Sequence, residues 1–132
     1  MIARTTSTAW VKGVVEMFSA EGLDVDELFR TAGLDVATLD DPAMRFQIDD
    51  VSVLWELAVE RSGNETLGLS RELAATYGNF DVVAYAMMTC QTLLEGLMRL
   101  ARYMNVVSNA ATFALTPAAD GHWLELGHMG GD

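Results

Sequence analysis

Two adjacent patterns between residues 92 and 128 decide the fold class. The stretch reads TLLEGLMRLARYMNVVSNAATFALTPAADGHWLELGH. Thr92 and Glu95 at its start form a capping box, in which each side chain satisfies a free amide of the first helical turn. The apolar residues that follow at helical spacing predict one buried face, made of Leu93, Leu97, Leu100, Ala101 and Met104.

The second half of the stretch has a period of two instead of 3.6. Phe113 and Leu115 fall on one face of a predicted strand. Residues 117–121 are typical of a turn, and Leu124 and Leu126 then alternate with other residues. The pattern predicts a β-hairpin. Because an isolated two-stranded ribbon is marginally stable and exposes an unpaired edge, we expect the sheet to continue beyond the sequence or to be completed by another subunit.

The N-terminal third of the sequence predicts helices. Residues 10–21 carry apolar side chains at helical spacing, with Ser7 or Thr8 available as the cap. A repeated Gly-Leu-Asp-Val motif then predicts two short helices at 25–32 and 36–40. Its Gly ends one helix in the left-handed conformation, and its Asp caps the next.

Three further segments lie between residues 49 and 90. Asp49 is expected to cap a helix at 50–62, and residues 66–77 suggest a short helix. The apolar segment 80–90 has no polar face and is interpreted as the central helix, with a strand as the alternative. The expected fold class is therefore α+β, a mostly helical N-terminal part followed by a β-hairpin that belongs to a larger antiparallel sheet.

Composition narrows the classes of function. A chain of 132 residues with 51% hydrophobic and 20% charged residues is expected to fold as one domain around one core. The net charge of -11 disfavours contact with nucleic acid phosphates or anionic membranes. Cys90 has no partner for an internal disulfide, and neither a signal peptide nor a membrane span is visible, so we expect a cytoplasmic protein.

Catalytic and metal-binding patterns are weak. His122 and His128 fall on one strand face, but six extended residues separate them by roughly 20 Å, too far to share a metal unless the strand bends. The acidic pairs at 40–41 and 49–50 are explained as helix caps and dipole partners. We expect no enzyme activity, no catalytic residues, no cofactor and no metal site.

The features best suited to ligand binding are large, adaptable apolar side chains. Methionine changes shape readily, while tryptophan and tyrosine add one polar group each to a mostly apolar pocket. The same side chains are equally suited to a protein core. The candidate ligand-binding residues are Trp10, Trp55, Tyr85, Met88 and Tyr103.

A series of short motifs carries a family resemblance. In chain order they are LFRTAGL at 28–34, RFQI at 45–48, LWE at 54–56, LGL at 67–69, YAM at 85–87, TLLEGL at 92–97 and LARY at 100–103. Together they resemble the N-terminal domain, of the arabinose-binding type, of AraC/XylS-type transcription regulators.

This resemblance implies that residues 1–132 are an effector-sensing and dimerisation domain, truncated on its C-terminal side. Full-length members join such a domain to a C-terminal pair of DNA-reading helix-turn-helix units, which are absent here. The implied partners are an unidentified small-molecule effector, bound between the helical layer and the sheet, and a second copy in a homodimer. DNA would be contacted only through the absent domain, and no membrane is involved. The alternative is a structural protein-protein interaction module without an effector.

Overall fold

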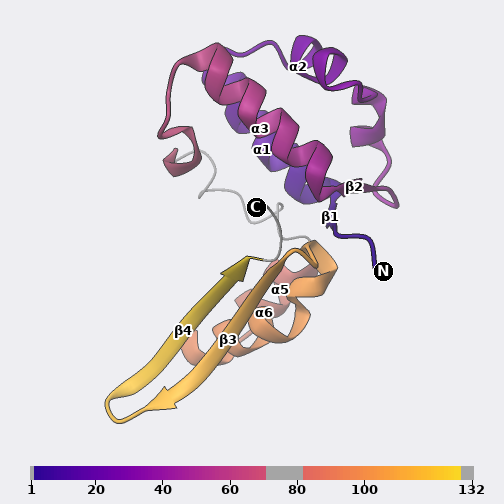
Figure 1. Cartoon of the computed structure of the whole chain (residues 1–132). Helices are drawn as coiled ribbons and strands as arrows, with labels where there is room; N and C mark the ends of the chain where they lie inside the picture. The colour runs from indigo at the N-terminus through magenta and orange to yellow at the C-terminus, as the bar shows by residue number, and fades with distance from the viewer. Residues whose placement is uncertain (1, 71–81, 129–132) are drawn as a thin grey trace.

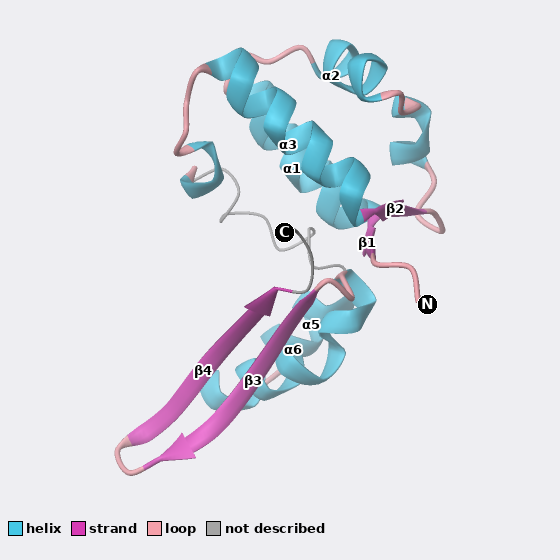
Figure 2. Ribbon diagram, in the orientation of Figure 1, coloured by secondary structure: helices cyan, strands magenta, loops and turns pink. Residues whose placement is uncertain are grey.

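The computed structural model describes residues 2–70 and 82–128. A helical N-terminal part and a second part made of two helices and a hairpin lie one above the other (Figure 1). The elements are β1 (Thr5–Ser7), α1 (Thr8–Ala20), α2 (Val25–Ala32), the 3-10 helix η1 (Val36–Asp40), β2 (Arg45–Gln47), α3 (Ile48–Ser62), the 3-10 helix η2 (Leu67–Leu69), α5 (Val82–Met88), α6 (Leu93–Val107), β3 (Ala111–Ala118) and β4 (Gly121–His128). This arrangement confirms the predicted α+β class (Figure 2).

The caps predicted for the first helices are confirmed. The Ser7 side chain accepts a hydrogen bond from the Trp10 amide at the start of α1. Asp24 accepts one from the Glu27 amide at the start of α2, and Gly33 ends that helix with a φ of 74°. These groups satisfy amides and carbonyls that a helix end leaves without partners. The predicted helix at 36–40 is present as η1.

The first hydrophobic cluster lies between α1, α2 and α3. Phe18 and Leu54 are almost completely buried there, and the Trp55 ring meets the Phe18 ring edge to face at 5.1 Å. Burial of such side chains contributes roughly 1.5–3 kcal/mol each. The packing of α1 against α3 therefore holds the N-terminal part together.

The predicted cap of α3 is wrong. The helix begins at Ile48, so that Asp49 and Asp50 lie in its first turn instead of before it. Gln47 occupies the cap position without a side-chain hydrogen bond. The two carboxylates still lie near the positive end of the helix dipole, which favours negative charge there.

Helix α5 corrects the prediction of a central apolar helix. The helical state is confirmed for Val82–Met88, and the strand alternative is wrong. Only Val83 and Ala84 of this helix are buried, whereas Tyr85 is 67% exposed. Residues 80–81 and most of the helix predicted at 66–77 lie outside the described residues. In the described part of that predicted helix, Leu67–Leu69 form the 3-10 helix η2.

Helix α6 has the predicted start but a different buried face. Thr92 accepts a hydrogen bond from the Glu95 amide, at 3.2 Å, and Glu95 accepts one from the Gln91 amide, at 3.1 Å. Leu93, predicted to be buried, is 79% exposed, and the residues that α6 contributes to the second cluster begin only at Leu100. The buried positions of the helix are Gly96, Leu100, Met104 and Val107.

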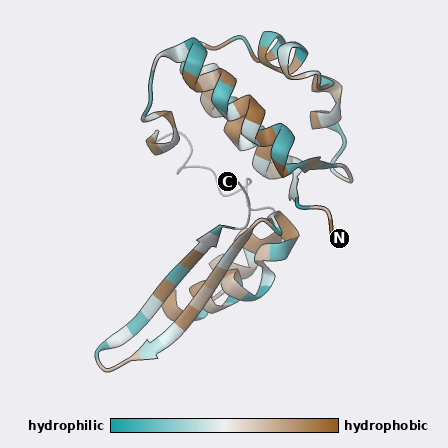
Figure 3. Cartoon of the chain, in the orientation of Figure 1, coloured by the Kyte–Doolittle hydropathy of each residue, from teal (hydrophilic) through white to brown (hydrophobic). Residues whose placement is uncertain are grey.

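The predicted hairpin is confirmed. Strands β3 and β4 pair antiparallel, with Phe113 opposite Leu126 and Leu115 opposite Leu124. Figure 3 shows hydrophobic residues along both strands. Phe113 packs against α6, but Leu126 remains 69% exposed on β4. In the described part of the chain, β4 pairs with β3 alone, so a larger sheet stays a prediction.

In residues 2–70 and 82–128 the buried hydrophobic side chains group into two clusters. The second cluster, between α5, α6 and β3, contains Val83, Leu100, Met104 and Val107. Trp10 packs against both clusters. Strand β1 also contacts the end of α6, because the Thr6 hydroxyl donates a hydrogen bond to the Val107 carbonyl at 3.1 Å.

Candidate effector groove between α5 and α6

An open groove runs along the side of α6 that faces α5. Its first part has a volume of about 550 Å³ and is lined by Ala86, Glu95, Met98, Arg99, Arg102 and Tyr103. A second, apolar part has a volume of about 320 Å³ and is lined by Val82, Val83, Ala86, Tyr103 and Val106. Ala86 and Tyr103 belong to both parts, so the two form one groove with a polar end and an apolar end.

Helical spacing explains why these residues share one surface. The α6 residues recur three and four positions apart, which places them in one stripe along the helix. Gly96 lies beside this stripe and is buried, and a Cβ there would lie 3.7 Å from the Met87 carbonyl oxygen. The backbones of α5 and α6 are therefore close at this point.

Hydrogen bonds fix the polar end of the groove. The Arg99 guanidinium donates through Nη1 to the Ala86 carbonyl, at 2.7 Å, and to the Thr89 hydroxyl, at 3.0 Å. These acceptors lie at the C-terminal end of α5, where helical carbonyls lack partners. Arg102 lies over the Tyr103 ring, 5.5 Å from its centre, a distance at which a cation and an aromatic face attract.

The residues that the sequence suggested as ligand contacts lie in different parts of the structure. Tyr103 lines the groove, whereas Tyr85 and Met88 are exposed on α5 and are not among its lining residues. Trp55 packs in the first cluster, and Trp10 lies between the two clusters. Apolar character alone therefore did not distinguish the groove from the core.

Sequence reasoning missed the charged residues of the groove. Glu95 and Arg99 are one helical turn apart, and Arg102 follows on the same stripe. Their spacing of four and three residues was a usable signal, because it places all three on one side of the helix. Leu100, Met104 and Phe113 pack together in the second cluster of the described chain, and an effector site between the helical layer and a larger sheet stays a prediction.

Among the described residues, Glu27 and Arg61 have shifted pKa values, and both lie in the N-terminal part, outside the groove. The Arg61 guanidinium, 3.2 Å from Glu27, lowers the pKa of that carboxyl group, and the Thr31 hydroxyl acts in the same direction. Glu27 in turn raises the pKa of Arg61. This pair joins α2 to α3 and is a structural contact.

Neither a metal-binding cluster nor a membrane-crossing helix occurs among the described residues. Residues 2–70 and 82–128 hold no group of three His, Cys, Asp or Glu side chains placed to bind a metal ion. None of the helices described there combines the length and the apolar character that crossing a membrane requires.

An open groove with a few polar groups is a feature that a ligand-sensing regulatory domain requires. Residues 22–130 match the family described as the arabinose-binding domain of AraC transcription regulator, N-terminal. The chain belongs to this family, which confirms the resemblance identified from its motifs. A search of curated proteins gave no match.

Proposed function

We propose that this chain senses a small-molecule effector in the groove between α5 and α6, and that binding there controls a DNA-binding domain of the same regulator. The observation that carries the proposal is the open groove in a domain of this family, with Tyr103 at its centre. Pockets that combine apolar walls with a few placed polar groups are typical of small-molecule sites.

A route from the groove to the N-terminal part supports this proposal. Val106 lines the apolar end of the groove, and its carbonyl oxygen accepts a hydrogen bond from Arg45 of β2. A ligand that shifts the end of α6 would alter this contact. Such a ligand changes the equilibrium only by the difference between its affinities for the two arrangements.

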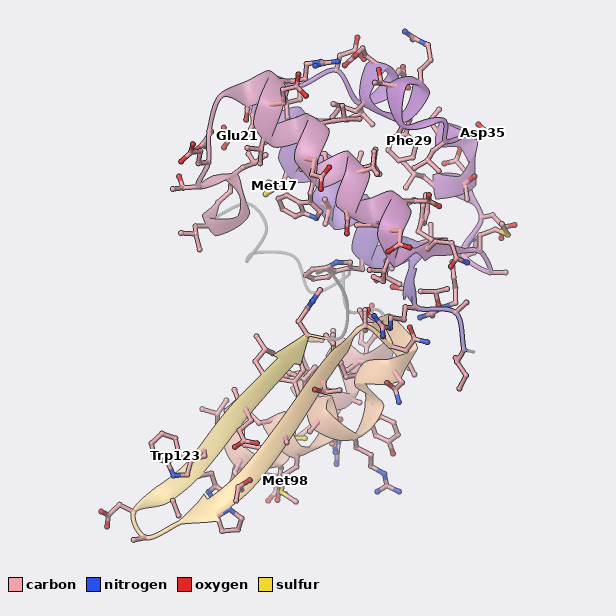
Figure 4. The ribbon with its side chains drawn as sticks, viewed as in Figure 1. Met17, Glu21, Phe29, Asp35, Met98 and Trp123 are labelled. Atoms are coloured by element: carbon pink, nitrogen blue, oxygen red, sulfur yellow. The ribbon has the colours of Figure 1, made fainter. Side chains whose placement is uncertain are left out.

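We also propose that the chain forms a homodimer through β4. Trp123 is 69% exposed and projects from the hairpin near its turn, away from Met98 of α6 (Figure 4). Leu124 and Leu126 are exposed on the other face of the same strand. Exposed apolar side chains along a strand edge favour addition of another strand. Because this chain is acidic, we expect the other domain of the regulator to contact DNA. We expect the regulator to act in the cytoplasm.

A thermal-shift screen of small metabolites tests the effector proposal. At least one compound should raise the melting temperature of the 132-residue chain. Tyr103→Ala should abolish this shift, while Tyr85→Ala, which removes an exposed tyrosine outside the groove, should preserve it. A broad panel that leaves the melting temperature unchanged would contradict the proposal.

A structural interaction module without an effector is the second candidate function. The exposed apolar residues of β4 favour it, because they are sufficient for self-association without a ligand. Sedimentation velocity separates the candidates. An effector-sensing domain should change its dimer fraction when the stabilising compound is added, whereas a purely structural module should keep the same fraction.

A further inference from the structure

We infer that the effector is an organic anion with a short apolar tail, its acidic group held between Arg99 and Arg102. This inference rests on the proposed function, because it names the ligand class of the same groove. The tail lies against Val82 and Val106 at the apolar end. The supporting observation is that two arginines lie beside the uncharged, apolar end of the same groove.

The charge of the groove departs from that of the chain. The sequence has nineteen acidic residues against eight Lys and Arg residues, so most cations have many potential partners. The ion pairs within the described residues both involve Arg61, with Glu27 and Glu60. Arg99 and Arg102 therefore line the groove without a carboxylate within 4.0 Å in that part of the chain.

Arg99 is held in place but keeps free donors. Both of its hydrogen bonds, within the described residues, come from Nη1. The Nε and Nη2 groups remain available, and together they form a planar fork that matches the two oxygens of a carboxylate. Because Ala86 and Thr89 restrain the side chain, binding costs little side-chain entropy.

Glu95 sets the direction in which the ligand lies. Its carboxylate lines the polar end of the groove beyond Arg99 and accepts a hydrogen bond from the Gln91 amide. A second negative charge placed there would be repelled. The acidic group therefore lies on the Arg102 side of Arg99, and the tail extends past Tyr103 toward Val106.

Isothermal titration calorimetry on the 132-residue chain tests this inference with three probes of equal tail length. The probes are octanoate, octan-1-ol and octylamine, at one salt concentration and below micelle formation. Octanoate should bind at least about tenfold more tightly than either of the others, because charge-assisted hydrogen bonds to a guanidinium are about twice as strong as neutral ones.

Arginine variants locate the anion. Arg102→Gln should weaken octanoate binding by about tenfold, the effect of one lost charge-assisted contact. Arg102→Lys should recover part of the affinity, because the charge remains while the planar fork is lost. Arg30→Gln removes an exposed arginine on α2 and should leave the affinity within about twofold. Circular dichroism confirms that each variant is folded.

The outcomes separate the ligand class from the function. If octylamine or octan-1-ol binds as tightly as octanoate, or if Arg102→Gln has no effect, the anion inference is overturned while effector sensing stands. If octanoate fails to bind but the metabolite screen finds a neutral or cationic effector, the anion inference is likewise overturned and effector sensing stands. If no probe and no metabolite binds, both proposals are overturned.

Discussion

The guanidinium of Arg45 donates a hydrogen bond to the carbonyl oxygen of Val106, 2.8 Å away. The same side chain donates to the Thr5 hydroxyl, at 2.7 Å, and to the Val107 carbonyl, at 3.3 Å. A single residue of β2 thus bonds both β1 and the last turn of α6, where helical carbonyls need partners and positive charge is favoured. Arg45 thus connects the N-terminal part to the helix that bears the groove, as the Thr6 hydroxyl also does.

Replacing Arg45 should loosen this connection. Arg45→Gln is expected to lower the free energy of unfolding by about 1–2 kcal/mol, because several hydrogen bonds to charged nitrogen atoms are lost at a partly exposed site. Urea denaturation measures the change. Arg30→Gln is the matched control and should stay within about 0.5 kcal/mol. Equal stability of the two variants would show that the Arg45 contacts do not join the two parts.

Two leucines test the assignment of the buried faces. Leu54 is 1% exposed in the first cluster, so Leu54→Ala should cost about 2–5 kcal/mol through lost burial and a new cavity. Leu93, at the exposed start of α6, should cost less than about 0.5 kcal/mol when changed to alanine. Chemical denaturation of both variants gives the comparison. A large loss of unfolding free energy in Leu93→Ala would instead support the buried face that the sequence predicts.

The Glu27 carboxylate should make stability depend on pH. Arg61 holds the pKa of Glu27 below its ordinary value of 4.5, so its stabilising effect is complete above that value and is lost as pH falls through the lower folded pKa. Glu27→Gln should therefore be less stable than the parent near pH 7, and the difference should vanish at acidic pH. Thermal melts between pH 7 and pH 3 measure it, and a difference that persists in acid would contradict the assignment.

The pairing of Gly127 with Thr112 can be examined through a double-mutant cycle. A Cβ on Gly127 would collide with the Thr112 hydroxyl oxygen across the hairpin. Gly127→Ala should destabilise the chain by about 0.5–1.5 kcal/mol, because the exposed Thr112 side chain must leave its preferred rotamer to make room. In a Thr112→Ala background the same change should cost much less, because the obstructing oxygen is gone. Additive losses would mean that the two residues do not face each other.

Local signals in the sequence were enough to predict most elements. The Asp24 cap and the left-handed Gly33 fix α2 through contacts within a few residues. The alternation of Phe113 and Leu115 with Leu124 and Leu126 fixes the hairpin register in the same way. Such signals depend only on residues close in sequence, so they can be interpreted without knowledge of the tertiary fold.

Burial and the groove depend on contacts between distant residues, which periodicity does not report. The apolar residues of α5 predict a buried helix, but the Tyr85 side chain is 67% exposed. Trp55 and Tyr103 are both large aromatic residues, and only their packing partners separate a core position from a groove position. Arg99 gains its place in the site from the Ala86 carbonyl, thirteen positions away.

The most direct measurement of the central claim is the contact between the bound effector and the methyl groups of α5 and α6. The stabilising compound should be added to methyl-labelled protein, and nuclear Overhauser effects between the two should be recorded. We predict effects from the compound to the methyl groups of Val82, Ala86 and Val106, which line the apolar end of the groove. Effects confined to other methyl groups, such as Leu54 in the first cluster or Leu126 on β4, would contradict an effector site between these helices.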